Sequence, residues 1–390
     1  MGLQFFALER RQEIDDLLVL QPYLGKKNRD SIERKIESIL DSNGMSVEYY
    51  WQFYHYRLHI FDRASRTVST ADYLNKLQAA EEMLDAHYAI QKLRFYVSSI
   101  AFRGFRSADS EYRMLAYMWD LLRAGPASSL PLVRIYLDFA YGLQHPEDEA
   151  RFADLLANLA SESNRIAPGE LRECYLIAQN YCAFKINQGR TEYYRTVFEI
   201  FRTLIERSIL LEEGRLSEGM YKNIITSGLR VNEYAWAESF ILSYSDYLPE
   251  QIRENARLFN LANLYSHQKM HDKVISLLQN VAYSDIVYVL GAKMILLRTY
   301  YESREYIALD SLLDSVRIYV NRNQQLSRQT KREYLGFLSF LKKTSALRRH
   351  DREAAMRLKA RITQSAAVAS KKWLLEKVDE FLGVRSDSRP

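Results

Sequence analysis

Two histidines in one short stretch have the spacing of metal ligands. His55 and His59 are four residues apart, which places both imidazoles on one face of a helix, where they can hold a divalent metal with carboxylate help. The residues between them are Tyr56, Arg57 and Leu58, so the glutamate of a metalloprotease motif is missing. Because no third ligand is evident, we interpret the pair as packing or interface histidines.

Two His-Asp dipeptides suggest a different chemistry. His271-Asp272 and His350-Asp351 resemble the adjacent pair of HD-type phosphohydrolases, all-helical enzymes that complete their metal site with a further His and Asp. The resemblance implies a metal phosphohydrolase, but it covers only two residues. Each pair also falls at an expected turn, where helix capping explains the aspartate.

Other catalytic patterns are missing from the sequence. The glycines never have the spacing of a phosphate-binding loop, and there is no G-x-S-x-G, H-E-x-x-H or C-x-x-C motif. We therefore predict no catalytic residue, no metal site and no cofactor, and we expect the protein not to be an enzyme.

A repeated pattern indicates which elements position these side chains. Tyr265, Leu277, Leu278 and Val281 recur 35 residues later as Tyr300, Leu312, Leu313 and Val316. A looser copy, with Ile224, Gly228, Phe240 and Ile241, precedes the first by 37 residues. This period is typical of tetratricopeptide-like helical hairpins, which bury their apolar faces against their neighbours. We predict an all-α fold, an α-solenoid of stacked antiparallel hairpins in a right-handed superhelix.

The composition and the positions of helix-breaking and capping residues agree with a helical array. The 390 residues include only 14 Gly and 7 Pro, too few for the turns of an all-β protein. We expect helices over residues 5–20, 29–42 and 47–63, with the polar residues 69–72 capping the next helix. The predicted divisions are a divergent array (1–220), clearer repeats (221–320) and basic capping helices (321–390), in one continuous solenoid.

The two cysteines and the apolar stretches bear on the compartment. Cys174 and Cys182 are eight residues apart on one expected helix, about 12 Å and too far for a disulfide. Two thiols without a disulfide framework indicate a reducing compartment. No apolar stretch is long enough to cross a bilayer, so we expect a cytoplasmic protein that does not engage the membrane.

The predicted function is binding. In such arrays the first helix of each hairpin lines a groove, where a peptide or partner helix can bind. We nominate the polar residues that the clearer repeats place on these helices: Asn260, Asn263, His267, Lys293 and Arg298. The sequence does not identify the partner or the oligomeric state.

The C-terminal residues offer an alternative. Residues 321–390 hold 17 Lys or Arg against 7 Asp or Glu. Lys342, Arg349, Arg352 and Lys359 are spaced to form one basic ridge, which would bind nucleic acid or an acidic partner in a salt-dependent way. The same charges also suit the polar outer face of a terminal capping repeat, and that interpretation stays open.

Two segments carry a family likeness. They are residues 17–20, leading through the next helix to Tyr49 and Tyr50, and residues 84–94. They resemble segments of a family of uncharacterised bacterial helical-repeat proteins, in which a long helical array precedes tetratricopeptide-like hairpins. The resemblance implies the architecture and a bacterial source, and it implies no activity or functional residue.

Overall fold

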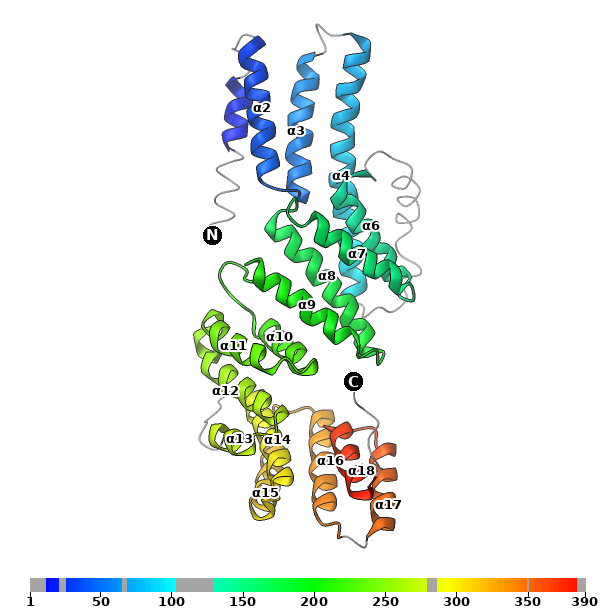
Figure 1. The fold of residues 1–390 in the computed structure, drawn as a ribbon, viewed down its shortest axis with the longest axis vertical. Coiled ribbons are helices and arrows are strands. Elements are labelled where there is room, and N and C mark those ends of the chain that lie inside the picture. The colour runs from blue at the N-terminus through cyan, green and yellow to red at the C-terminus, as the bar shows by residue number, and fades with distance from the viewer. Residues whose placement is uncertain are drawn as a thin grey trace. The chain divides into compact units, whose positions relative to one another are not determined.

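The computed structural model describes residues 12–20, 26–64, 69–102, 129–278, 286–348 and 351–383. Within these ranges the regular structure is helical, without a strand, and one isolated bridge pairs Met45 with Ile166 (Figure 1). The prediction of an all-α protein is therefore confirmed at this level. The chain divides into two compact units, Met1–Gly214 and Arg215–Pro390. Helix α15, residues Tyr306–Arg322, spans residue 320.

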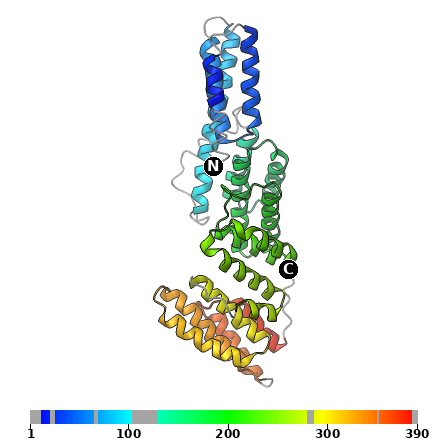
Figure 2. The same ribbon diagram turned by 90° about the vertical axis from the view of Figure 1, so that its left-hand side faces the viewer.

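The first unit begins with helices where the sequence predicted them, except that residues 5–11 of the first predicted helix lie outside the described residues. Residues 12–20 are helical, and the remaining helices are α2 (Lys26–Ser42), α3 (Val47–Ala64), α4 (Thr70–Phe102), α6 (Pro131–Gln144), α7 (Glu149–Glu162), α8 (Pro168–Asn187) and α9 (Tyr193–Glu206). The Ser69 hydroxyl accepts a hydrogen bond from the Asp72 N–H at 3.2 Å, so the predicted cap of α4 is confirmed. Both views show α2, α3 and the first part of α4 side by side (Figure 1, Figure 2).

Aromatic side chains fill the space between these helices. Tyr50, Phe53 and Tyr56 of α3 are buried, and the rings of Phe53 and Tyr56 meet edge to face with centroids 5.9 Å apart. The Tyr56 hydroxyl reaches Glu37 of α2 at 3.4 Å, so its polar end has a partner while its ring is buried. The aromatic run at residues 49–56 packs helices together, as a run at helical spacing most often does.

One buried carboxylate joins α3, α4, α6 and α8. Glu170, in the first turn of α8, is 7% exposed. One carboxylate oxygen accepts the Tyr136 hydroxyl of α6, and the other accepts the first N–H of α3, from Val47, at 3.2 Å. The Arg94 guanidinium of α4 lies 3.7 Å from the second oxygen. A negative charge at the start of α3 also complements the helix dipole, so Glu170 caps a helix that is distant in sequence.

The same region holds the isolated bridge. The Met45 N–H donates to the Arg165 carbonyl at 2.6 Å, and the Ala167 N–H donates to the Met45 carbonyl at 2.9 Å. Gly44 has φ +74°, and a Cβ there would lie 2.8 Å from the Ala167 nitrogen. Glycine is therefore required at residue 44 both for its backbone conformation and for the close approach of the two loops.

The second unit is a succession of helices. They are α10 (Glu218–Arg230), α11 (Tyr234–Tyr244), the short 3-10 helix η3 (Ser245–Tyr247), α12 (Glu250–His267), α13 (His271–Leu278), α14 (Ile286–Glu302), α15 (Tyr306–Arg322), α16 (Arg328–Ser345), α17 (Arg352–Gln364) and α18 (Lys371–Leu382). Each helix from α10 to α16 contacts the next, and α12 also contacts both α10 and α14. One apolar core extends through α12–α18.

Three turns in this unit have the same backbone geometry in the register of the sequence repeat. The carbonyls of Gly228, Tyr265 and Tyr300 each accept the N–H five residues later, at 2.9, 2.9 and 2.8 Å. The residue just before each of these donors has a left-handed backbone, with φ of +62°, +58° and +62°. The repeat therefore marks three equivalent helix–turn–helix connections.

None of the described helices combines the length and the apolar character that a membrane span needs.

Candidate binding surfaces

The residues predicted to face a partner do not share one surface. Asn260 is only 4% exposed, and its amide donates to the Ala256 carbonyl one turn earlier, at 2.8 Å. Its expected place on a partner-facing surface is therefore corrected, because the side chain lies in the interior. Lys293 is half-buried, with its ammonium 6.0 Å from the ring centroid of Tyr319 on α15. Asn263 is half-buried on α12.

His267 and Arg298, by contrast, are near each other and near Arg230. His267 ends α12, Arg230 ends α10, and Arg298 lies on α14. Desolvation lowers the pKa of His267, and the positive charges of Arg230 and Arg298 lower it further. We call these three residues the cationic cluster. Their mutual repulsion disfavours the imidazolium and would be relieved by an anion.

Arg298 has unused hydrogen-bonding capacity. Its Nε atom is buried and has no hydrogen-bond partner among the described residues. Desolvation also lowers the pKa of this guanidinium, which the charge of Glu302 partly opposes. A guanidinium that is partly removed from water and not fully hydrogen-bonded favours a carboxylate or phosphate, which can accept two parallel N–H bonds.

Glu302 is largely engaged by other groups. Its carboxylate accepts the Trp373 indole N–H at 2.9 Å and lies 3.1 Å from the Lys377 ammonium, both from α18. Burial alone would raise the pKa of Glu302, but these two hydrogen bonds, together with the positive charges of Lys377 and His271, outweigh it, and the pKa lies below its usual value. Glu302 therefore pairs with Lys377, while its charge also acts on Arg298.

The predicted basic ridge is present only in part. Lys342 and Arg352 are exposed, whereas the Lys359 ammonium pairs with Asp379 of α18 at 2.6 Å. Arg349 lies outside the described residues. Arg352 and Lys359 border an open cavity of about 500 Å³ on α17, whose wall includes the exposed side chain of Met356.

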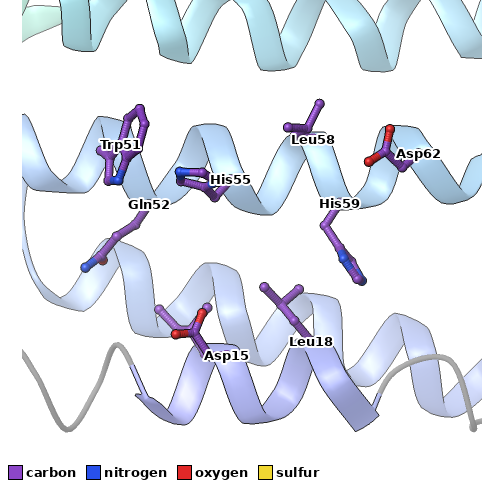
Figure 3. A pocket seen from close by; sticks show the side chains of 9 residues that line it. Asp15, Leu18, Trp51, Gln52, His55, Leu58, His59 and Asp62 are labelled. Carbon is purple, nitrogen blue, oxygen red and sulfur yellow. The ribbon is translucent and has the colours of Figure 1, made fainter.

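The two histidines of α3 do not point to a common centre. They border a cavity of about 370 Å³ between α3 and the helix of residues 12–20. Figure 3 shows His59 directed toward Leu18 of that helix, while His55 lies beside Trp51. The ring centroids of Trp51 and His55 are 4.3 Å apart, which is a packing contact.

The His-Asp pairs can be assessed only where the structure describes them. Over the parts of the chain that the structure describes, no group of three or more His, Cys, Asp or Glu side chains could hold a metal ion. His350 lies outside those parts. Asp351 occupies the predicted N-cap position of α17, but its carboxylate accepts the N–H of the preceding Arg348, at 3.0 Å, instead of a helix N–H.

Sequence reasoning missed Arg230 and the α18 residues that engage Glu302. Arg230 precedes His267 by 37 residues, which is the offset of the looser repeat copy, so extending the repeat to helix ends would have found it. Trp373 and Lys377 lie beyond the clear repeats, and no sequence signal connects them with Glu302.

Comparisons of the chain with protein-family models, with curated proteins and with solved structures found no match.

Proposed function

We propose that the protein is a non-enzymatic interaction scaffold, in which the second unit binds a peptide or partner helix that carries carboxylates. In this proposal the hairpins stack as a tetratricopeptide-like solenoid, and the partner lies along α10, α12 and α14. The three equivalent turns and the contacts of α12 with α10 and α14 support this arrangement. Most of the apolar surface of such an array is used between hairpins, which leaves polar side chains to select the partner.

The observation that carries the proposal is the cationic cluster. Arg230, His267 and Arg298 come from three successive first helices, and the Arg298 Nε has no described acceptor. An Asp or Glu side chain, or a C-terminal carboxylate, would supply that acceptor and offset the repulsion among the cations. A partner segment with spaced acidic residues therefore fits this surface best.

The test is affinity capture from native lysate, followed by measurement of the captured partner's affinity. The variant Arg230→Gln/His267→Gln/Arg298→Gln replaces the three side chains of the cationic cluster by neutral ones. A matched control, Lys293→Gln, removes a cation from α14 that packs on Tyr319 instead. We expect the triple variant to bind at least about tenfold more weakly, since hydrogen bonds to charged groups each contribute about 1.5–3 kcal/mol. If the partner binds the triple variant with wild-type affinity, the assignment of this surface is wrong.

Nucleic-acid binding through the C-terminal helices is the second candidate, supported by the exposure of Lys342 and Arg352. Phosphate contacts would make the affinity fall steeply with salt. Nuclease-treated captures at low and moderate salt separate the candidates. Retained nucleic acid that is lost with salt, and is reduced by Lys342→Gln/Arg352→Gln, would favour the second.

A further inference from the structure

The long helix α4 has an exposed apolar stripe. Leu74, Leu77, Leu84, Tyr88 and Phe95 are between 37% and 63% exposed. Their successive spacings are three, seven, four and seven residues, which are the intervals of the apolar positions in a coiled coil. The opposite side of α4 packs into the first unit. The helix therefore has one buried face and a second, mainly apolar face over about six turns, in which Glu81 and Gln91 occupy the intervening positions of the same pattern.

Charged residues along this second face differ between its two halves. The N-terminal half has two exposed acids, Glu81 within the stripe and Asp85 beside it. Residues 86–102 contain no Asp or Glu, and they include Lys92, whose ammonium lies 5.3 Å from the Tyr88 ring centroid. Asp85 and Lys92 are seven residues apart, so both lie on the same edge of the stripe. A helix that is acidic in its first half and basic in its second is complementary to itself when two copies run antiparallel.

We infer that the exposed face of α4 is a self-association surface, on which two copies of this chain pair through antiparallel α4 helices about a two-fold axis. In such an isologous contact each interaction occurs twice. The register that places Asp85 of one copy opposite Lys92 of the other brings Leu84 close to Phe95. It also places Tyr88 beside the axis, so the two tyrosines meet. The inference rests on the first unit alone and is independent of the proposed function of the second.

Charge-swap variants of the full chain, followed by sedimentation equilibrium, test this pairing. We expect the wild-type chain to dimerise. Asp85→Lys and Lys92→Asp singly replace both ion pairs by like-charge contacts, so each should weaken the dimer about tenfold or more. The double variant Asp85→Lys/Lys92→Asp restores opposite charges and should restore the dimer. Because Asp85 is exposed and Lys92 is only half-buried, circular dichroism should show unchanged helicity in all three variants.

A cross-link tests the register separately. With Tyr88→Cys, oxidation should join two chains covalently, because the two residues meet beside the axis. Asn75→Cys places a thiol on α4 away from the stripe and should remain uncoupled under the same conditions. A wild-type chain that is monomeric at every attainable concentration would overturn the inference. A dimer that is indifferent to both single charge reversals would also overturn it, and would indicate a different surface.

Discussion

Removing the Glu170 carboxylate should destabilise the first unit far more than an ordinary glutamate substitution. Glu170→Ala leaves the Tyr136 hydroxyl and the Val47 N–H without their buried acceptor. Each such loss costs about 1–3 kcal/mol. The ion pair adds little, because the side chain of Arg94 is 35% exposed and water screens its charge. The expected loss is therefore about 4 kcal/mol, a large part of the stability of a typical domain.

The assay is urea unfolding followed by tryptophan fluorescence, in a Trp236→Phe/Trp373→Phe background that leaves tryptophans only in the first unit. The matched control is Glu173→Ala, also on α8, whose side chain is 44% exposed and pairs with Arg172. We expect this control to change the free energy of unfolding by less than about 1 kcal/mol. Equal losses in the two variants would refute the argument that buried hydrogen bonding, and not charge alone, makes Glu170 important.

Three further outcomes follow from the structure. Gly44→Ala should lower the free energy of unfolding in urea by about 1–3 kcal/mol, because the new Cβ would lie 2.8 Å from the loop before α8 and the residue has φ +74°. The control Gly169→Ala has open space around its Cβ and should be nearly neutral in the same measurement. A thiol reagent should label Cys174 and Cys182 only on unfolding, because both are buried and burial raises the pKa of Cys182 to about 12. Rapid labelling of the native protein would contradict this prediction. Since the pKa of His267 is lowered in the folded state, the unfolded state binds more protons, and stability should fall as pH drops through about 6.5. His267→Gln should remove that part of the pH dependence of the urea midpoint.

The helices and the repeated turns were predictable because their signals are local. Ser69 caps α4 through a contact three residues away. The Asn43-Gly44 stop works because Gly44 adopts a left-handed backbone. The repeated hairpin turns followed from equivalent apolar positions, since the same packing recurs 35 and 37 residues apart. The caps and stops depend on residues within one or two turns of helix, and the repeat depends on positions that recur along the chain, so one sequence suffices to find both.

The candidate surface was less predictable, because its side chains depend on neighbouring helices. Asn260 and His267 lie on the same helix, yet Asn260 is buried and His267 is exposed. The polarity of a residue does not by itself show which face of the helix the residue occupies. The partners of Glu302 come from α18, and those of Glu170 from helices far away in sequence. Such contacts follow from the packing of whole helices, and they cannot be predicted from the local sequence pattern around either residue.

The bridge between Met45 and Ile166 has a consequence for how the protein is made. Its two halves are separated by roughly 120 residues, which a ribosome adds in about 6–24 s. During that interval the loop before α3 lacks its backbone partners. Folding of the first unit during synthesis should therefore wait for the turn between α7 and α8, and the nascent N-terminal helices remain open to chaperones until that turn emerges.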